Sequence, residues 1–327
     1  MRQRPFSQFQ WWAVIAVSAS CIGSGYATAQ TAVRPELTLE DIFLNDTFAG
    51  QSFAGGQWAD SGPVVTYVVP SGPDQTSIVS YDLESDEVTV LVDGALLYAD
   101  DVDRVITIDS YRFTSDGRKV LLYSDSERVW RRNTKGYYYV FDLDDETLTP
   151  ISDREFGFQM FAKLDPSGSR VAFVRQRNIF MVDLESGEET RLTRDGSPGG
   201  VINGTSDWVY EEEFGLRNAW HWSPDGSRIA FLQLDETRTR DYWLPDLRGQ
   251  YPEFKRFRYP KAGEANSEIQ AGSIDVETGE ITFFDTDTWY AGGDDHEYLS
   301  QIGWTPEIDG SNKIWVLRLN RDQNNLD

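Results

Sequence analysis

The chain has 327 residues, of which 54 are Asp or Glu and 30 are Lys or Arg, giving a formal net charge of −24 at pH 7. This excess of negative charge excludes nucleic acid as a partner, because phosphate binding needs clustered Lys and Arg. A negative field attracts amine-bearing ligands, but it also keeps an exported protein soluble, so charge alone names no substrate. The single cysteine, Cys21, leaves no disulfide to form within the chain.

The first 29 residues have the parts of a secretory signal peptide. Two arginines give a basic start, residues 11–22 are a short apolar run, and Ala27–Ala29 matches a small-residue cleavage site. The run is short for a membrane span, although a retained signal anchor stays open. We therefore expect a signal peptide at 1–29, a mature domain at 30–327, and a periplasmic or secreted protein.

Two short patterns alternate after residue 40. A tight turn followed by an apolar strand occurs at 114–123, 165–174 and 223–232, with degenerate copies at 60–62 and 309–310. A strand, a turn and a second strand occur at 78–91, 139–151, 179–192 and 273–284. Glycine in these turns allows the positive φ that β-branched residues resist. No long amphipathic helix is evident, so both patterns predict short β-strands.

Recurrence of such units every 40–60 residues or so is typical of β-propeller blades. We predict an all-β fold, a β-propeller of four-stranded antiparallel blades, of which the pattern covers roughly five. A strand predicted at 313–319 is followed almost directly by the end of the sequence. We therefore expect an incomplete propeller from a longer protein, with a shorter propeller that closes on itself as the alternative.

One segment, at 207–226, joins an acidic triplet to an aromatic frame. Bulky, β-favouring residues at 208–210 precede Glu211–Glu213, and Phe214, Trp220 and Trp222 follow. Most acidic runs are solvated surface. Carboxylates held among so many rings instead indicate charges fixed in place to meet a cation.

The string DWVYEEE at 207–213 resembles a motif of the dipeptidyl peptidase IV family of prolyl-specific serine peptidases. Further matching strings are LTLEDIF at 37–43, VWRR at 129–132, YPKAGEAN at 259–266 and LNRDQNNLD at 319–327. The resemblance implies that this chain is the amino-terminal propeller portion, eight-bladed in the family. It also implies peptide substrates with a free amino terminus.

By this resemblance, Glu212 and Glu213 bind the α-amine of the substrate, so that only two residues fit between them and the nucleophile. Arg131, in VWRR, matches the arginine that contacts a substrate carbonyl. The alternative for the glutamates is a local ion pair, for example with Arg217, with the other carboxylate facing solvent. The alternative for Arg131 is an exposed blade-edge arginine beside acidic residues at 125 and 127.

The catalytic triad of the family is not recognisable here. Its serine lies in a G-x-S-x-G turn on a carboxy-terminal α/β-hydrolase domain, with a histidine base later in the chain, and this sequence contains no such turn. His221 and His296 are therefore expected to be structural or surface residues. We expect no catalytic residue, no metal site and no cofactor in this chain, and no activity from it alone.

The expected function is the substrate-selecting portion of an exported dipeptidyl peptidase IV-like serine exopeptidase, which releases X-Pro or X-Ala dipeptides. The expected partners are the hydrolase domain and, since the family dimerises through both domains, a possible second copy. A related tripeptidyl or acylaminoacyl peptidase is one alternative, although acylated substrates lack the ammonium that the triplet would meet. A non-catalytic periplasmic scaffold or binding module is the other.

Overall fold

The computed structural model describes residues 37–48, 55–59, 62–286, 298–306 and 311–327. The chain divides into two compact units, residues 1–53 and 54–327. In these described ranges no helix is long and apolar enough to cross a membrane. The predicted signal peptide lies outside them.

The first unit contains two short helical segments, α1 (Leu39–Phe43) and η1 (Asp46–Phe48). Thr38 caps α1, since its Oγ1 accepts a hydrogen bond from the Asp41 backbone N–H at 3.1 Å. The Asp41 carboxylate in turn accepts from the backbone N–H of Thr38, which completes a capping box.

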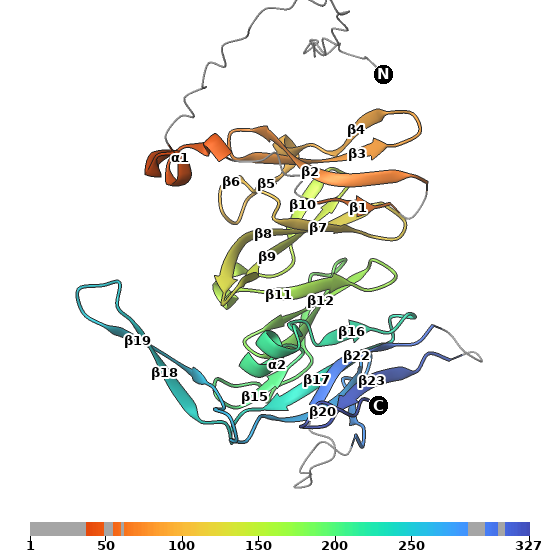
Figure 1. Cartoon of the computed structure of the whole chain (residues 1–327). Helices are drawn as coiled ribbons and strands as arrows, with labels where there is room; N and C mark the ends of the chain where they lie inside the picture. Colours follow the sequence, from red (N-terminus) through yellow and green to blue (C-terminus); the bar gives the residue numbers. More distant parts are fainter. Residues whose placement is uncertain (1–36, 49–54, 60–61, 287–297, 307–310) are drawn as a thin grey trace, which may run out of the picture. The chain divides into compact units, whose positions relative to one another are not determined.

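The second unit is a succession of antiparallel sheets, which we call blades 1 to 5 (Figure 1). Blade 1 contains β1 (Gln57–Trp58), β2 (Val64–Gly72), β3 (Gln75–Asp82) and β4 (Glu87–Val92). Blade 2 contains β7 (Ser110–Phe113), β8 (Lys119–Val129), β9 (Arg132–Asp142) and β10 (Thr147–Pro150). Blade 3 contains β11 (Met160–Leu164), β12 (Arg170–Arg175), β13 (Asn178–Asp183) and β14 (Glu189–Arg191).

Blade 4 differs because its first strand is interrupted. It contains β15 (Val201–Asn203), β16 (Trp220–Trp222), β17 (Arg228–Asp235), β20 (Glu268–Asp275) and β21 (Ile281–Phe283), and both β15 and β16 pair with β17. Blade 5 contains β22 (Tyr298–Trp304) and β23 (Ile314–Leu319). The remaining elements are η2 (Gly94–Leu96), β5 (Tyr98–Ala99), β6 (Arg104–Val105), η3 (Arg154–Phe156), α2 (Trp208–Glu213), β18 (Asp241–Asp246) and β19 (Glu253–Arg258).

The predicted fold class is confirmed: the regular structure of the described chain is nearly all antiparallel β-sheet, and blades 1 to 3 each have four strands. The turn-plus-strand pattern forms the connection from the first to the second strand of blades 2, 3 and 4. The strand–turn–strand pattern forms the third and fourth strands of blades 1 to 4. The degenerate copies fall largely outside the described residues.

Hydrophobic cores lie between neighbouring blades. In β12, Val171 and Phe173 pack with residues of blade 2, whereas Ala172 and Val174 pack with residues of blade 4. Similar cores join blade 1 to blade 2 and blade 4 to blade 5. Because side chains alternate along a strand, each central strand supplies both cores at once.

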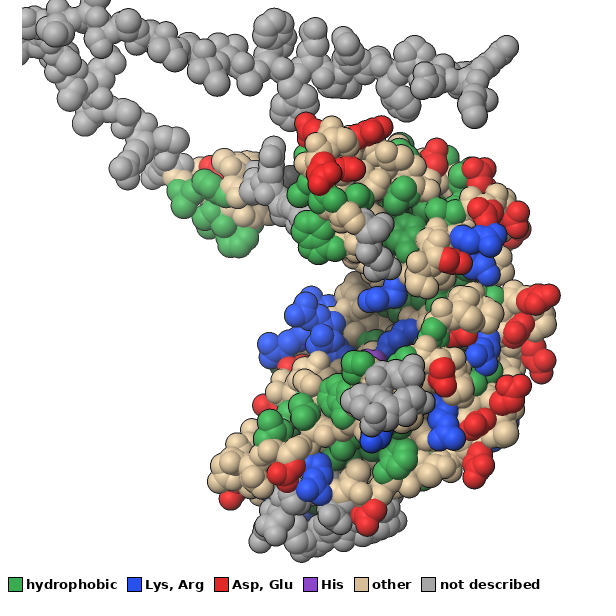
Figure 2. Space-filling view, turned by 90° about the vertical axis from the view of Figure 1, so that its right-hand side faces the viewer, with side chains coloured by type: hydrophobic (Ala, Val, Ile, Leu, Met, Phe, Trp, Pro, Cys, Tyr) green, Lys and Arg blue, Asp and Glu red, His purple; other side chains and the backbone are tan. Residues whose placement is uncertain are grey.

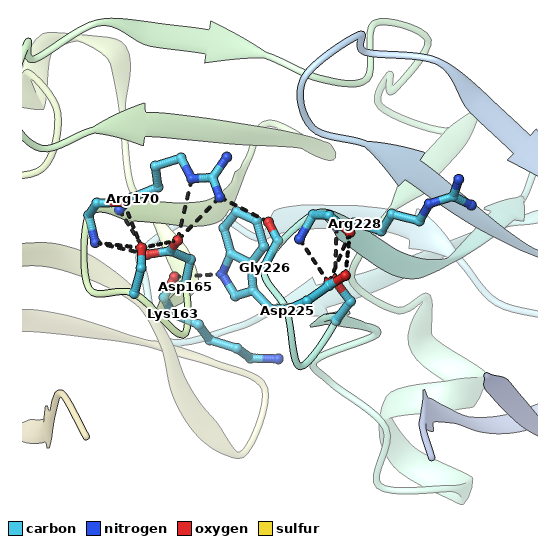
Figure 3. Close-up of polar contacts among 11 residues, drawn as sticks. Lys163, Asp165, Arg170, Asp225, Gly226 and Arg228 are labelled. Carbon is cyan, nitrogen blue, oxygen red and sulfur yellow. Dashed lines mark hydrogen bonds and ion pairs between the residues drawn. The ribbon is translucent and has the colours of Figure 1, made fainter. Parts of the chain in front are cut away.

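The blades converge at their first strands. Gln57 Nε2 donates to the Tyr111 carbonyl at 2.6 Å, and the indole Nε1 of Trp222 donates to the Lys163 carbonyl at 3.0 Å. At the same boundary between blades 3 and 4, Arg170 Nη2 donates to the Gly226 carbonyl at 3.0 Å (Figure 3). The last strand of blade 1 is instead mostly exposed. In a propeller the edge at which blades converge faces the central channel.

Blade 4 approaches blade 3 closely at Gly204, so a substitution there tests how tightly the two blades pack. Its φ is +72°, and a Cβ there would lie 2.9 Å from Ile179 Cγ1 of β13. Gly279 has the same φ with nothing within 4 Å of such a Cβ. We expect Gly204→Ala to lower the free energy of unfolding by about 1–3 kcal/mol more than Gly279→Ala, because only Gly204 adds overpacking to backbone strain. Urea denaturation of both variants measures this, and equal losses would contradict it.

Candidate functional site

The acidic triplet lies on an insertion in the first strand of blade 4. The chain leaves the sheet after β15, forms α2 and rejoins the same edge as β16. The isolated bridge between Thr205 and Asn218 closes the base of this insertion. The insertion thus carries α2 on the edge of the blade that faces the channel.

Asp207 holds α2 in place. Its Oδ1 accepts from the Tyr210 backbone N–H at 2.9 Å as the helix N-cap, and its Oδ2 accepts from the Ser267 hydroxyl at 2.6 Å. Tyr210, fully buried, packs with Phe214 and with Tyr298 of β22. Val209 and Tyr210 therefore fix this short helix to the core, whereas Glu211 and Glu212 are partly exposed and Glu213 is exposed.

Arg131 comes from a different blade. It follows Trp130 in the turn between β8 and β9, and Trp130 has a φ of +51°. The Trp130 ring lies 4.7 Å from the Phe257 ring, edge-on, and the Lys255 Nζ lies 3.7 Å from its centre. These contacts with β19 anchor the turn that presents Arg131.

The structure brings Arg131 and Glu212 together. Arg131 Nε lies 2.9 Å from Glu212 Oε2, with the Arg131 side chain 81% exposed and the Glu212 side chain 15% exposed. Ion pairs with an exposed partner contribute about 0–1 kcal/mol to stability. A ligand can therefore rearrange this pair at little cost. Glu213, next to it, is solvent-exposed and forms no ion pair within the described chain.

A cavity of about 820 Å³ is lined by sequence neighbours of the site residues, although not by Arg131, Glu212 or Glu213 themselves. The lining includes Trp130, Trp208 and Glu211, together with residues of β19 and of blade 3. Glu211 Oε1 is shielded from solvent and has no hydrogen-bond partner among the described residues. Burial raises the pKa of Glu211, the charge of Arg217 opposes that shift, and the charge of Glu212 adds to it.

The base of the hairpin β18–β19, at Phe257 and Tyr259, contacts both the turn that carries Arg131 and the helix α2 that carries the glutamates. Phe257 contacts Trp130 beside Arg131, whereas Tyr259 packs edge-on against Trp208 of α2 at 4.4 Å. The Phe257 and Tyr259 rings lie 6.1 Å apart. An aromatic chain thus joins the arginine turn to the glutamate helix.

The two alternatives for these residues are met in part, since the Arg131 side chain is 81% exposed and Glu213 faces solvent. Arg217 makes no ion pair with Glu212 or Glu213 in the described part of the chain, and Asp125 pairs with Arg104 and Arg154 rather than with Arg131. The substrate-binding roles of Glu212, Glu213 and Arg131 stay predictions.

Three features of the site were not predicted from the sequence. The bulky residues at 208–210 favour strands, yet they form α2, because the Asp207 cap and the burial of Tyr210 override that propensity. The sequence did contain one signal for a helix start: Asp207 is a favourable N-cap residue, and the acidic Glu211 follows in what becomes the first turn. The anchoring of Trp130 by β19 and the shielding of Glu211 had no local signal.

No group of three or more His, Cys, Asp or Glu that could hold a metal ion occurs among the residues that the structure describes. The acidic segment at 291–297, which contains His296, lies outside them.

Glu211 gives a pH-dependent prediction. A carboxyl group whose pKa is raised by folding destabilises the folded state when ionised, and this cost fades as the pH falls. We therefore expect Glu211→Gln to raise the melting temperature at pH 7.5 and to raise it less at pH 4.5. Glu188→Gln, in the exposed β13–β14 turn, is the control. Thermal unfolding at both pH values measures the effect, and a gain that does not change with pH would contradict it.

Comparison with known proteins places this geometry in a family. A family profile described as "Dipeptidyl peptidase IV (DPP IV) N-terminal region" matches residues 114–327. A probable dipeptidyl-aminopeptidase B of Emericella nidulans is 32% identical over 252 residues, which cover 73% of this chain and 26% of that protein. A protein of the same name from Talaromyces marneffei is 30% identical over 63% of this chain and 24% of its own length. This chain spans about a quarter of these relatives.

Solved structures agree. Porphyromonas gingivalis dipeptidyl peptidase 4 superposes with a TM-score of 0.76 at 30% identity, covering 89% of this chain and 39% of that one. A putative dipeptidyl aminopeptidase IV from Bacteroides ovatus, with a TM-score of 0.55 at 20% identity, shares the fold. With more than half of its residues matched by the family profile and its blades matched by a family structure, this chain belongs to the dipeptidyl peptidase IV N-terminal region family.

Proposed function

We propose that this chain is the substrate-selecting propeller portion of an exported dipeptidyl peptidase IV-like serine exopeptidase that releases X-Pro or X-Ala dipeptides. The observation that carries the proposal is the contact of Arg131 with Glu212, beside an exposed Glu213, next to a large cavity. Export is part of the proposal and rests on the signal-like residues 1–29. The proposal includes a hydrolase domain that supplies the triad.

The chemistry suits a peptide amino terminus. An ammonium group donates up to three hydrogen bonds, and two neighbouring carboxylates can accept them with charge assistance. The planar guanidinium of Arg131 can hold Glu212 and a peptide carbonyl at once. Fixing the ammonium in this way sets how far the chain reaches toward a nucleophile, which makes the site a length gauge.

Two alternatives are weaker on the same chemistry. An acylaminoacyl peptidase has no use for an ammonium site, because its substrates carry no free amine. A scaffold without a hydrolase domain is consistent with the fold, but it provides no reason for Glu212 and Glu213 to lie together beside Arg131. The coding sequence that follows Asp327 tests the scaffold: a G-x-S-x-G turn with later Asp and His supports a peptidase, whereas a stop codon supports the scaffold.

The amine site has a direct test in the full-length enzyme. Replacing both Glu212 and Glu213 with Gln removes the charge-assisted bonds, which we expect to cost about 2–5 kcal/mol in transition-state binding, or roughly 30- to several-thousand-fold in kcat/KM for a Gly-Pro chromogenic substrate. Replacing Glu185 and Glu188 with Gln removes the same charge from an exposed turn and is the matched control.

Labelling by an active-site serine probe that ignores the amine should be unchanged in the Glu212/Glu213 variant. The 327-residue chain alone should hydrolyse nothing. Unchanged turnover by that variant would show the two glutamates to be framework residues, and hydrolysis by the chain alone would overturn the need for a separate triad.

A second copy of the chain is the other proposed partner. The hairpin β18–β19 projects from blade 4 (Figure 1) and exposes large apolar side chains, among them Trp243 at 55% and Phe254 at 60%. Their strand register places both on one face of the hairpin. Exposed apolar patches of this kind mark protein–protein contacts.

We expect Trp243→Glu combined with Phe254→Glu to shift the full-length enzyme from dimer to monomer in sedimentation velocity. Val88→Glu combined with Val90→Glu, on the exposed strand β4, is the control. A wild-type monomer, or a dimer that survives the hairpin substitutions, would count against this contact.

A further inference from the structure

The blade repeat places a basic side chain at the same position in three consecutive blades. A backbone hydrogen bond across five residues closes each first turn, and its donor defines the equivalent position in each blade: Thr114 to Lys119, Asp165 to Arg170, and Ser223 to Arg228. Two residues before these donors lie Arg112, Lys163 and His221. We call these three residues the cationic row.

The members of the row are neighbours across the blade boundaries. Lys163 Nζ donates to the carbonyl of Trp220 in the next blade and lies 4.3 Å from the centre of its ring. A second type of contact repeats between successive blades. Trp222 Nε1 of blade 4 donates to the Lys163 carbonyl of blade 3 at 3.0 Å, and Trp304 Nε1 of blade 5 donates to the His221 carbonyl of blade 4 at 3.1 Å. The row therefore runs along the edge where the blades converge.

The charges of the row act on one another. Burial, and then the charge of Arg112, lowers the pKa of Lys163 to about 7. Burial, and then the charge of Lys163, lowers the pKa of His221 to about 4. Burial is the larger cause of both shifts, and the smaller cause places Arg112 near Lys163 and Lys163 near His221. At pH 6, Arg112 and Lys163 therefore carry the positive charge, whereas His221 is neutral and can offer a ring N–H.

No carboxylate of the described chain neutralises this charge. Within the ranges that the structure describes, none of the three forms an ion pair within 4.0 Å, although the protein has 54 acidic residues against 30 Lys and Arg. Other arginines of the same blades are paired, as Arg154 is with Asp101 and Arg170 with Asp165. Figure 2 shows Lys and Arg side chains gathered in the hollow of the face that it presents, and Asp and Glu side chains along its right-hand rim.

An anion at the row would gain Coulomb attraction without first breaking an ion pair. The row is also close to the amine site along the chain. Glu213 and His221 are eight residues apart, which limits the separation of their Cα atoms to about 29 Å. A peptide of about nine extended residues, at roughly 3.3 Å per residue, covers that distance.

We propose that Arg112, Lys163 and His221 bind a carboxylate group of the peptide substrate, so that the chain selects peptides with an ammonium at one end and a carboxylate further along. This inference rests on the proposed function, because it takes the ligand to be a peptide. The carboxylate has two possible sources, the carboxy terminus and an acidic side chain.

The test is titration calorimetry of the full-length enzyme, with its catalytic serine replaced by Ala to prevent cleavage, at pH 6 and low ionic strength with three nonapeptides that begin Gly-Pro with a free amine. The first has a free carboxy terminus and no acidic side chain, the second is amidated with one central Asp, and the third is amidated without an acid. We expect about tenfold tighter binding of the first, the second or both relative to the third. Which of the two binds tightly identifies the source of the carboxylate.

Arg112→Met combined with Lys163→Met should remove this preference and leave the third peptide unaffected. Arg194→Met combined with Lys313→Met removes the same charge from exposed positions and should keep the preference. Because Lys163 is half-buried and packs on the Trp220 ring, Arg112→Met alone, at an exposed residue, is the second variant, and it should reduce the preference without loss of thermal stability.

Equal binding of the three peptides, or a preference that survives the double variant, would overturn the cationic row as a carboxylate site. Glu212→Gln combined with Glu213→Gln should weaken all three peptides alike, which tests the amine site separately. Loss of that effect with the carboxylate preference intact would instead count against the proposed function.

Discussion

A four-stranded blade has two apolar faces, and neither can face water at an acceptable cost. Each blade is therefore stable only between two neighbours, and the cores of this chain accordingly lie between blades rather than within them. In β12, Phe173 and Val174 are adjacent in sequence and fully buried in different cores. This reciprocal packing fixes the distance between neighbouring blades, on which every inter-blade contact of the candidate site depends.

The candidate site uses two interruptions of that regular frame. The insertion between β15 and β16 carries the glutamates, and the hairpin between β17 and β20 supplies the aromatic root that steadies the Arg131 turn. Both insertions connect strands of blade 4, so the same sheet holds both of them in place. The Arg131–Glu212 contact itself contributes little to stability, which leaves these side chains free to exchange partners while their backbones stay fixed.

Charge is organised by the same frame. Acidic residues such as Asp142, Asp183 and Asp275 end the third strands, and their carboxylates accept backbone N–H bonds from the exposed turns that follow. Asp225 has a similar role in a turn between first and second strands (Figure 3). The net charge of −24 is therefore partly a consequence of turn chemistry. The edge at which the blades converge differs from these acidic turns, because Arg112, Lys163 and His221 occupy the equivalent position in three consecutive blades there.

The sequence by itself determined the blades and their turns. Alternating apolar residues bounded by Gly-containing turns specify strand, turn and face locally, so segments such as 165–174 and 179–192 could be placed without a structure. It also made Glu212, Glu213 and Arg131 candidates for substrate binding, through strings that resemble those of a known family. Only the tertiary structure decided that Arg131 lies against Glu212, that residues 208–213 are helical, and that Phe257 anchors Trp130. These outcomes depend on which blades are neighbours and how far apart they pack, and long-range packing of that kind leaves no periodic trace in the chain.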